Sequence, residues 1–308
     1  MVYDVIIVGG GPGGLTAGIY AGRANLKTLM LEKLMPGGQA ASTDWVENYP
    51  GFEEGIGGFD LMQKMEKQAK RFGLEIESAE IESADLSGNV KRLMAGGKEY
   101  QGRSVILSTG TTPKPLGVPG EKEFRGHGVS YCATCDGPFF KDKDIVVVGG
   151  GSSGVQESLY LTRFVKSIKL VEFTDHLCAE RILQKRLKQN PKISIYLKHE
   201  VMAIEGDKTV NAVRVRNKAT GATESLSVNG AFIWVGVSPN TEFLAGQVKL
   251  NPWGYVVTDA AMKTSVPGVF AAGDLRDMPV RQITTAVADG TVAAISALCY
   301  IEGLENHG

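Results

Sequence analysis

The chain has 308 residues, a formal net charge of −1 and four cysteines. That length is enough for two domains, each with its own hydrophobic core. The near-neutral charge gives no global field that would recruit nucleic acid or anionic lipid, and four cysteines are too few for the disulfide framework of a secreted protein, so we expect a cytoplasmic protein that binds no nucleic acid.

The first predicted element is a β-branched strand over 5–8, which leads into the fingerprint GxGxxG at 9–14. Because the strand begins almost at the initiator Met, we expect no signal peptide. A helix is predicted over 15–26 and a second strand over 28–32, which ends in the acid Glu32. Strand, fingerprint, helix and acid in this order are typical of a dinucleotide-binding βαβ unit.

Each glycine of this fingerprint has its own physical task. Gly9 allows a tight turn, Gly11 lets the backbone approach a pyrophosphate, and Gly14 packs the helix against the strand. Glu32 is placed to accept hydrogen bonds from a ribose diol. A glycine-rich turn that binds no ligand is the alternative for this pattern.

The segment YCATCDGP at 131–138 contains a CxxC pair, Cys132 and Cys135, followed by Asp136. Such a pair brings two sulfurs within disulfide range and commonly lowers one thiol pKa, so that a thiolate exists near neutral pH. In a chain of this kind, a lone CxxC predicts redox chemistry.

Zinc is the other standard interpretation of a CxxC pair. A structural zinc site needs four ligands, and the remaining cysteines, Cys178 and Cys299, stand alone, so we expect no metal. These two cysteines are expected to be small buried hydrophobic side chains. The histidines form no ligand-spaced cluster and receive no role: they are His127, His176, His199 and His307.

A second copy of the opening unit follows the CxxC pair at an offset of 140 residues. A strand leads into a second GxGxxG at 149–154, a helix is predicted over 155–164, and a strand over 167–173 contains the acid Glu172. Because Glu32 and Glu172 are also 140 residues apart, the repeat extends through the whole βαβ unit. Two dinucleotide sites and a dithiol in one chain predict an electron relay that ends at a disulfide.

The last predicted element is a buried C-terminal helix around the longest apolar stretch, 291–301. No apolar run approaches the roughly 20 residues that a membrane span needs. We therefore expect no membrane partner.

Motifs along nearly the entire chain resemble those of the low-molecular-weight thioredoxin reductases. They are VGGGPGG at 8–14, PGGQ at 36–39, ENYPG at 47–51, STG at 108–110, CATCDG at 132–137, and GVFAAGD at 268–274 followed by Arg281-Gln282. The resemblance implies an α/β fold of two Rossmann-like dinucleotide-binding domains, the second inserted in the first. An FAD-binding domain would comprise 1–113 and 243–308, and the inserted pyridine-nucleotide domain, which carries the CxxC, would comprise 114–242.

The resemblance also implies which residues contact each dinucleotide, with the flavin ribitol on Asp274 and the isoalloxazine edge on 281–283. The residues expected at FAD are Gly9, Gly11, Pro12, Gly13, Gly14, Glu32, Lys33, Gly38, Gln39, Asn48, Gly110, Asp274, Arg281, Gln282 and Ile283. Those expected at NADH, if it is used, are Gly149, Gly151, Ser152, Ser153, Gly154 and Glu172. For Asp274, the alternative is a turn or C-cap acid after Gly273.

By the same resemblance, Cys135 is the flavin-proximal sulfur, and Cys132 attacks the disulfide of thioredoxin or a thioredoxin-like protein. Asp136 would protonate the leaving thiolate, a role that requires burial to raise its pKa. The alternative for Asp136 is a turn residue ahead of Gly137-Pro138. The family further implies a homodimer whose inserted domain rotates about its two linkers.

The chain departs from this family where the electron donor binds. NADPH-dependent members carry His-Arg-Arg at the end of the second strand of the inserted domain, with another arginine four residues on, to bind the 2′-phosphate. Here 172–178 reads EFTDHLC, with no arginine and two acids. An unpaired carboxylate about 4 Å from a phosphate charge costs about 1–4 kcal/mol, or roughly 5- to 1000-fold in affinity. The segment therefore favours NADH, whose free 2′-hydroxyl suits Glu172, over NADPH.

Other interpretations remain open at this point. The flavin could receive its electrons from a donor other than a nicotinamide, such as reduced ferredoxin, or the chain could retain some use of NADPH. The acceptor could be a peroxidase or a glutaredoxin-like domain instead of thioredoxin. In a different class, the protein could be a dinucleotide-binding redox sensor without a dedicated reductase activity.

Overall fold

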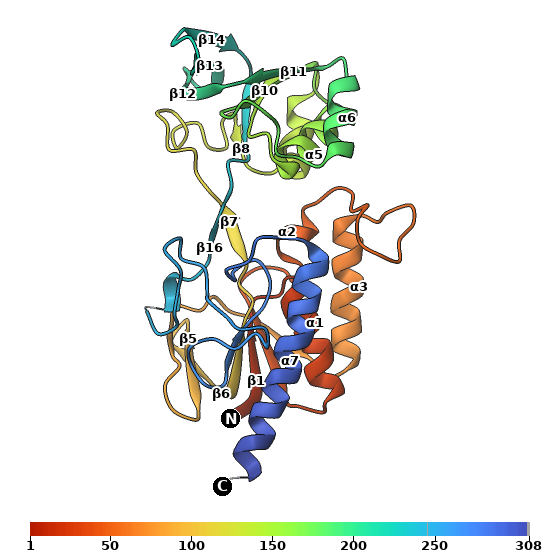
Figure 1. Cartoon of the computed structure of the whole chain (residues 1–308), viewed down its shortest axis with the longest axis vertical. Coiled ribbons are helices and arrows are strands. Elements are labelled where there is room, and N and C mark those ends of the chain that lie inside the picture. Colours follow the sequence, from red (N-terminus) through yellow and green to blue (C-terminus); the bar gives the residue numbers. More distant parts are fainter. Residues whose placement is uncertain (245, 307–308) are drawn as a thin grey trace. The chain divides into compact units, whose positions relative to one another are not determined.

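The computed structural model describes residues 1–244 and 246–306, which leaves His307 outside the described residues. The chain forms two compact units: unit 1 comprises Met1–Thr112 and Ser238–Gly308, and unit 2 comprises Pro113–Val237 (Figure 1). We expected the chain to return from the inserted domain to the first domain after residue 242. In the structure it returns after Val237. The reason is that Asn240 is bonded into unit 1, where its backbone N–H donates to Gly110 O at 3.0 Å and its side-chain amide donates to Thr109 O at 2.8 Å.

Unit 1 is built on a seven-stranded sheet in the order β3-β2-β1-β6-β5-β4, with β17 also paired to β6. Strands β1, β2, β3, β6 and β17 pair in parallel, whereas β4 and β5 pair antiparallel. The strands are β1 Val2–Val8, β2 Thr28–Glu32, β3 Glu75–Ser78, β4 Ser83–Asp85, β5 Lys91–Ala95, β6 Lys98–Leu107 and β17 Val269–Ala271.

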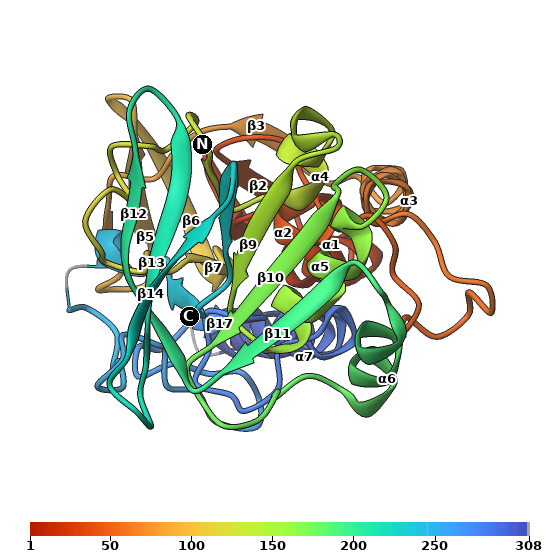
Figure 2. The ribbon, with the colours of Figure 1, turned by 90° about the horizontal axis from the view of Figure 1, so that it is seen from above.

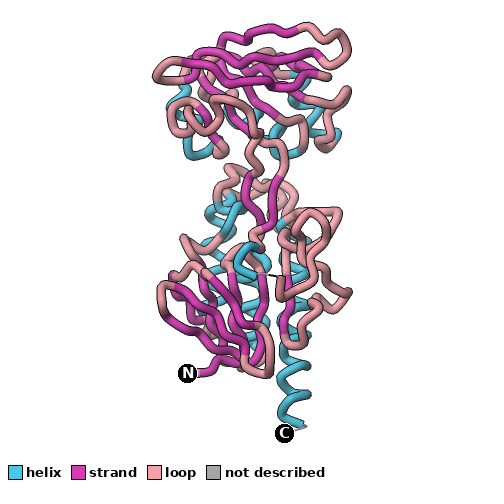
Figure 3. Tube along the Cα trace, turned by 90° about the vertical axis from the view of Figure 1, so that its left-hand side faces the viewer, coloured by secondary structure: helices cyan, strands magenta, loops and turns pink. Residues whose placement is uncertain are grey.

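The two faces of this sheet are covered by different layers because successive strand residues point to opposite sides. Val5 and Ile7 of β1 pack among the apolar side chains of α1, α3 and α7, while Ile6 and Val8 belong to a second core on the other face. Helices α1, α3 and α7 run side by side in Figure 1, and Figure 3 shows the long helix that leads to the C-terminus. The helices of unit 1 are α1 Pro12–Arg23, α2 Gly38–Ala41, α3 Gly58–Arg71, α7 Ile283–Asn306 and the 3-10 helix η2 Glu242–Leu244.

Helix α7 is much longer than the predicted stretch 291–301. Its residues Ile283–Glu305 are long and apolar enough to cross a membrane by length and composition, so the expectation that no segment approaches that size is wrong. A single helix of this kind is weak evidence for a membrane span, because the core helices of globular domains have the same composition. Here Ala293, Ala297 and Ile301 are buried in the core of unit 1.

Unit 2 contains a five-stranded parallel sheet in the order β11-β10-β9-β15-β8 and a three-stranded antiparallel sheet, β12-β13-β14 (Figure 2). The strands are β8 Val129–Ser130, β9 Asp144–Val148, β10 Ser167–Glu172, β11 Ile193–Leu197, β12 His199–Gly206, β13 Val210–Asn217, β14 Thr223–Ser227 and β15 Gly230–Ile233. The helices are α4 Ala133–Asp136, η1 Gly137–Phe140, α5 Ser152–Leu161 and α6 Arg181–Gln189.

Unit 2 has three layers. Val146 and Val148 of β9 pack against the antiparallel sheet, including Val213 of β13. Ile145 and Val147, which point the other way, pack against α5 and α6. The parallel sheet is therefore buried on both faces, as the β-branched sequence of β9 predicts.

The internal repeat is reproduced in the strand register. Val5 pairs with Thr28 in unit 1, and Ile145 pairs with Ile168 in unit 2, which is the same register at an offset of 140. Both fingerprint helices begin three residues before their predicted starts, because the last residues of each fingerprint already form the first helical turn. At the crossings between the units, β7 Thr111–Pro113 pairs with β16 Val237–Pro239.

Candidate active site

The first fingerprint forms a tight strand-to-helix turn at the end of β1. Gly9 has φ +101°, and a Cβ there would lie 2.4 Å from Ser108 O. A Cβ on Gly14 would lie 2.0 Å from Gly9 O, so only glycine permits this helix-to-strand contact. In contrast, a Cβ on Gly11 would meet no atom within 4 Å, and Pro12 begins α1 in the position where a missing N–H costs nothing.

The predicted ribose acid of unit 1 is fixed beside this turn. Glu32 ends β2, its Oε2 accepts a hydrogen bond from the Gly10 N–H at 2.6 Å, and its Oε1 accepts one from the Leu34 N–H at 3.0 Å. The next residue, Lys33, places its Nζ 3.6 Å from Glu80 at the surface. The fold therefore brings Glu32 to the fingerprint and engages the Lys33 ammonium in a surface ion pair.

The turn that begins α2 packs against the same fingerprint. Gly38 has φ +56°, and a Cβ there would lie 3.4 Å from Gly11 Cα. The Gln39 amide donates to Thr111 O at 2.5 Å and to Thr111 Oγ1 at 2.8 Å. Gly110 has φ +63°, and its missing side chain leaves open space in front of it.

Two predicted residues that are far apart in sequence meet directly. The Asn48 side-chain amide donates to Gln282 Oε1 at 3.1 Å across a separation of 234 positions. The neighbouring guanidinium of Arg281 lies 4.3 Å from the ring centroid of Tyr255, and its Nε is buried without a hydrogen-bond partner among the described residues. Ile283 is the first residue of α7.

Asp274 lies in the turn that follows β17, next to a buried ion pair that sequence reasoning missed. Asp289 of α7 accepts a hydrogen bond from the Gly273 N–H at 3.0 Å, and its other oxygen lies 2.6 Å from the guanidinium of Arg276. Only 11% and 9% of the Arg276 and Asp289 side chains are exposed. Burial raises the pKa of Asp274, with Arg281 opposing and Asp289 adding to that effect.

The sequence alone does not mark Asp289. Helix α7 contains two acid–glycine pairs, Asp289-Gly290 and Glu302-Gly303, and Glu302 is exposed. A Cβ on Gly290 would lie 2.1 Å from Gly13 O, so α7 and α1 are in backbone contact at this point. An acid in the same turn as such a contact is buried by it, and it requires a partner.

The second fingerprint repeats the geometry of the first. Gly149 has φ +115°, and a Cβ there would lie 2.1 Å from Trp234 O at the end of β15. A Cβ on Gly154 would lie 2.0 Å from Gly149 O, and a Cβ on Gly151 would meet open space. The carboxyl edge of the unit 2 sheet is therefore shaped like the carboxyl edge of the unit 1 sheet.

The acid of the second fingerprint, Glu172, makes the same kind of backbone hydrogen bond as Glu32. Glu172 ends β10, and its Oε2 accepts a hydrogen bond from the Gly150 N–H at 2.5 Å. Its Oε1 accepts hydrogen bonds from the Thr174 N–H and hydroxyl, both at 2.8 Å. The two glutamates thus occupy equivalent places in the two units.

Most side chains of the segment 173–178 are exposed, although Leu177 is buried. The Phe173 ring is covered by Lys218, whose Nζ lies 3.4 Å from the ring centroid. Asp175 and His176 form a pair at 2.8 Å, and the hydrogen bond from His176 lowers the pKa of Asp175. The Cys178 sulfur lies 3.8 Å from His176 Nε2.

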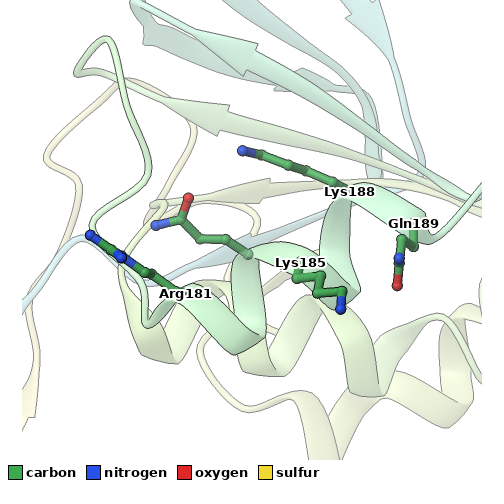
Figure 4. Close-up of a pocket in the computed structure, with 5 residues that line it drawn as sticks. Arg181, Lys185, Lys188 and Gln189 are labelled. Atoms are coloured by element: carbon green, nitrogen blue, oxygen red, sulfur yellow. The ribbon is translucent and has the colours of Figure 1, made fainter.

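Helix α6 begins beside the second fingerprint. Ser152 and Ser153 form the first turn of α5, and Ser152 Oγ accepts a hydrogen bond from the Glu180 N–H at 3.4 Å, one residue before α6. The side chains of α6 line an open cavity of about 450 Å³, and Figure 4 shows that most of them are long and basic. The lining residues are Arg181, Gln184, Lys185, Lys188 and Gln189.

The redox pair lies at the start of the short helix α4. Cys132 and Cys135 form a disulfide with their Cα atoms 5.4 Å apart. The Cys135 N–H donates to Cys132 Sγ at 3.2 Å, and Thr134 Oγ1 lies 3.4 Å from the same sulfur. Cys132 Sγ therefore has two hydrogen-bonding neighbours.

Asp136 is bonded back to the residue that ends β8. The Ser130 hydroxyl lies 2.6 Å from Asp136 Oδ2, and Ser130 is almost fully buried. The same Oγ lies 3.1 Å from Cys132 N and 3.2 Å from Cys132 O. Sequence reasoning placed Asp136 at this site and missed Ser130.

A buried acid, Glu121, supports the redox segment. Glu121 accepts hydrogen bonds from the Tyr131 hydroxyl at 2.5 Å and from the backbone N–H groups of Leu116 and Gly117. Burial, with added effects of Glu121, raises the pKa of Tyr131 to about 12. Glu121 therefore links the backbone at Leu116 and Gly117, near the start of unit 2, to Tyr131, the residue before Cys132.

The remaining cysteines differ from expectation. Cys178 and Cys299 are exposed, so the prediction that they are buried hydrophobic side chains is wrong. Cys178 lies in the exposed segment after Glu172, and Cys299 lies on the outward face of α7. Within residues 1–244 and 246–306, no three His, Cys, Asp or Glu side chains gather as a metal site would require.

Comparison with known proteins decides the family. The family model described as Pyridine nucleotide-disulphide oxidoreductase matches residues 3–290. The chain is 47% identical to the thioredoxin reductase of Mycolicibacterium smegmatis, over 96% of each chain. It is 46% identical to the thioredoxin reductase of Bacillus subtilis, over 99% of this chain and 96% of that one. The chain belongs to the thioredoxin reductase family.

A solved member of this family has the same fold. The crystal structure of the thioredoxin reductase of Lactococcus lactis matches with a TM-score of 0.96 at 40% identity, over 98% of this chain and 99% of that one. The predictions of an α/β fold with two dinucleotide-binding units and of a flavoprotein oxidoreductase of the thioredoxin reductase type are confirmed at the level of the family.

Proposed function

We propose that the chain is a thioredoxin reductase that passes electrons from NADH through FAD to the Cys132–Cys135 disulfide, and from there to thioredoxin or a thioredoxin-like protein. One observation carries the proposal. The disulfide lies in the same unit as a dinucleotide fingerprint that repeats the first one in backbone conformation, strand register and acid. A chain with one dinucleotide site and a structural disulfide would not need this repeat.

The residues of unit 1 fit a bound FAD. The Nε of Arg281 is buried and lacks a partner among the described residues, and open space lies in front of Gly11 and Gly110. A buried donor without a partner costs about 1–3 kcal/mol, so a ligand acceptor at this place is favoured. Gly11 would face the pyrophosphate, Glu32 the ribose, and Asp274 and Arg281 the flavin end. When bound, FAD carries two electrons between the nicotinamide and the disulfide.

The chain's own thiols perform the exchange with the protein partner. Once the disulfide is reduced, Cys132 attacks a sulfur of the partner's disulfide as a thiolate and forms a mixed disulfide. Cys135 then attacks Cys132, which releases the partner's second thiol and restores the Cys132–Cys135 disulfide. Asp136 holds the proton that the Cys132 sulfur gives up and takes back. Phe139, close in sequence to the disulfide, is 73% exposed, which supports a protein partner at this face.

The preference for NADH rests on charge at the second site. The Glu172 carboxylate is fixed at the fingerprint, and residues 173–178 include Asp175 and no arginine. A 2′-phosphate beside these acids would be repelled, whereas a free 2′-hydroxyl can donate to Glu172. We therefore place NADH ahead of NADPH.

The exposed basic face of α6 favours a second candidate for the donor. Arg181, Lys185 and Lys188 line the same open cavity, and an acidic electron-transfer protein such as reduced ferredoxin would complement their charge (Figure 4). In this version, the flavin and dithiol chemistry is unchanged and the second fingerprint binds no nicotinamide.

An anaerobic titration separates these donors. The FAD-loaded enzyme is titrated with NADH, NADPH and reduced ferredoxin in turn, while the flavin absorbance and the reduction of thioredoxin are followed. The proposal expects rapid bleaching by NADH, much slower bleaching by NADPH, and reduction of thioredoxin after bleaching. Bleaching by ferredoxin alone would establish the second candidate, and bleaching without reduction of any protein disulfide would indicate a redox sensor.

We further propose a cytoplasmic homodimer. The outward face of α7 carries the exposed apolar side chains Val292 and Ile295. Ile295 and Cys299 line a cavity of about 520 Å³ together with the loop that precedes β17 and the start of that strand. Burial of this face against a second copy would remove it from water. A reducing cytoplasm would keep the exposed thiols of Cys178 and Cys299 free.

A further inference from the structure

We infer that Ser130 is a positioning residue for Asp136, and that its hydroxyl group holds the Asp136 carboxyl group in both its charged and its neutral form. The inference rests on the proposed function, in which Asp136 exchanges a proton with the Cys132 sulfur. Ser130 lies outside the motif that carries the resemblance to the family, and its role follows from its contacts.

The position of Ser130 is fixed by the fold. It is the last residue of β8, the edge strand of the parallel sheet of unit 2, and only 4% of its surface is exposed. Its Oγ lies within hydrogen-bond distance of Asp136 Oδ2 at 2.6 Å, of Cys132 N at 3.1 Å and of Cys132 O at 3.2 Å. One hydroxyl group therefore contacts both the candidate acid and the peptide of the attacking cysteine.

The number of hydrogen bonds that a hydroxyl group can donate and accept explains why serine can contact Asp136 in both protonation states. A serine hydroxyl donates one hydrogen bond and accepts two. When Asp136 is ionised, Ser130 donates to Oδ2 and accepts from the Cys132 N–H. When Asp136 is neutral, its O–H donates to Ser130 Oγ, and Ser130 turns its own proton to Cys132 O. The three observed contacts serve both states without any movement of a heavy atom.

The proton step that needs this arrangement balances as follows. Reduction of the disulfide by two electrons breaks the S–S bond and leaves the Cys132 and Cys135 sulfurs as two thiolates. The Asp136 carboxylic acid gives its proton to the Cys132 thiolate, which yields a neutral Cys132 thiol and an Asp136 carboxylate, while Cys135 remains a thiolate. The reverse transfer regenerates the Cys132 thiolate that attacks the partner. A carboxyl group that loses its anchor and moves by about 1 Å can slow such a step by roughly 100-fold.

The chain offers a matched control for this contact. The Ser167 hydroxyl donates to Asp144 Oδ1 at 2.6 Å, which is the same kind of bond at the same length in the same unit. Ser167 and Asp144 begin β10 and β9, at the opposite end of the parallel sheet from the fingerprint. Removal of that hydroxyl tests what the loss of a serine–aspartate bond does to the unit in general.

The test uses the FAD-loaded enzyme and two substitutions of nearly equal shape, Ser130→Thr and Ser130→Val, which differ by one hydroxyl group and both suit a strand. Ser130→Ala is a second variant without the hydroxyl, and Ser167→Ala and Asp136→Asn are the references. Three quantities are measured from pH 5.5 to 9: bleaching of the flavin by its donor, alkylation of the reduced Cys132 thiol by iodoacetamide, and steady-state reduction of thioredoxin.

We expect Ser130→Val and Ser130→Ala to slow thioredoxin reduction about 10- to 100-fold. Both should change the pH profile of Cys132 alkylation in the same way as Asp136→Asn, while flavin bleaching is unaffected. Ser130→Thr should retain the wild-type profile, and Ser167→Ala should retain both the profile and the turnover. In the Asp136→Asn background, Ser130→Val should add no further loss, because the two residues act in one step.

Two results would overturn the inference, and they differ in what they say about the proposed function. If Asp136→Asn alters the alkylation profile but Ser130→Val does not, Asp136 acts without Ser130. If Asp136→Asn itself leaves the profile unchanged, the proton role of Asp136 is wrong and the role of Ser130 is lost with it. Additive losses in the double variant would likewise show that Ser130 does not act through Asp136.

Discussion

The Glu172 carboxylate accepts a hydrogen bond from the backbone N–H of Gly150 at 2.5 Å. This contact fixes the acid at the fingerprint before any nucleotide arrives, so little ordering remains to be done on binding. The bond is repeated in unit 1, where Gly10 donates to Glu32 at 2.6 Å. Both acids keep lone pairs that a ribose hydroxyl can use.

The charge of Glu172 is expected to set the choice of nicotinamide. Glu172→Gln retains an acceptor for the Gly150 N–H and removes the negative charge. The KM for NADPH should therefore fall by about 5-fold or more, because about 1 kcal/mol of repulsion is lost, and the KM for NADH should rise. Both constants are read from the bleaching of the flavin. Asp207→Asn, in the exposed turn between β12 and β13, is the control, and an unchanged ratio in Glu172→Gln would contradict the electrostatic argument.

The two cysteines are expected to separate the halves of the reaction. Cys132→Ser and Cys135→Ser each remove the disulfide but leave both fingerprints intact. Thioredoxin reduction should fall to the uncatalysed background, while bleaching of the flavin by its donor continues at the wild-type rate. Stopped-flow absorbance and a coupled turnover assay measure the two rates. Cys178→Ser removes an exposed thiol of the same unit and should change neither.

The buried ion pair of Arg276 and Asp289 is expected to stabilise unit 1 and its FAD site. Asp289→Ala leaves a buried guanidinium without its partner and frees the Gly273 N–H, at a cost of about 3–5 kcal/mol. Denaturant unfolding and FAD release should both reflect this loss. The exposed pair of Arg103 and Glu305, at 2.7 Å, is the control, since Glu305→Ala should cost at most about 1 kcal/mol.

Asp274 is expected to make the FAD-free protein less stable as the pH rises. Its folded-state pKa is raised by burial, so its folded form binds a proton more readily than its unfolded form does. That contribution is present below the unfolded pKa and is lost as the pH rises through the folded pKa. Asp274→Asn should therefore stabilise the FAD-free protein at neutral pH, have little effect near pH 3, and weaken FAD binding.

Asp85 provides a comparison of opposite sign for that experiment. Hydrogen bonds from Ser87 lower the pKa of Asp85, so its contribution is present at neutral pH and is lost as the pH falls through the folded pKa. Asp85→Asn should therefore reduce the stability at neutral pH, not increase it. Guanidinium unfolding curves at pH 3 and pH 7 give both signs. A gain in stability from Asp274→Asn at pH 3 equal to that at pH 7 would exclude the titration argument.

Helix α7 is expected to carry the contact between two copies of the chain. Ile295 is 45% exposed on the outward face of α7. Ile295→Glu places a charge in that face and should convert a dimer into a monomer, as measured by sedimentation velocity. Ile182→Glu, a change at an exposed isoleucine of α6, should leave the mass unchanged. Dimers that persist in Ile295→Glu would show that the contact lies elsewhere.

The parts of the site that follow from local rules were predictable from the sequence. The positive φ of Gly9 and Gly149 and the strand-ending places of Glu32 and Glu172 all arise within one βαβ unit, where spacing alone determines geometry. The resemblance placed Asn48 and Gln282 each at the cofactor but did not predict the hydrogen bond between them. That bond depends on the tertiary fold.

The residues that sequence reasoning missed depend on contacts that form only in the folded chain. Ser130 lies only six residues before Asp136, but their hydrogen bond depends on how the end of β8 is oriented toward α4, and no spacing rule predicts it. The Arg276–Asp289 pair forms only when α7 packs beside the turn after β17. The exposure of Cys178 and Cys299 was wrongly predicted for a related reason. A small thiol suits a core or a surface equally well, and the side on which each cysteine lies is fixed by the packing of its neighbours.

The pairing of β7 with β16 has a consequence for how such a chain arose. The chain enters and leaves unit 2 at adjacent points, since the Lys114 N–H donates to Gly236 O at 2.9 Å. Within unit 1, the Asn240 N–H donates to Gly110 O. Within the topology of unit 1, the whole of Pro113–Val237 is one long surface loop. The entropic cost of closing a loop rises only slowly with its length. We therefore expect that a duplicated copy of such a unit can be inserted at this place without disturbing either core, and that Pro113–Val237 can be exchanged for the corresponding unit of a relative.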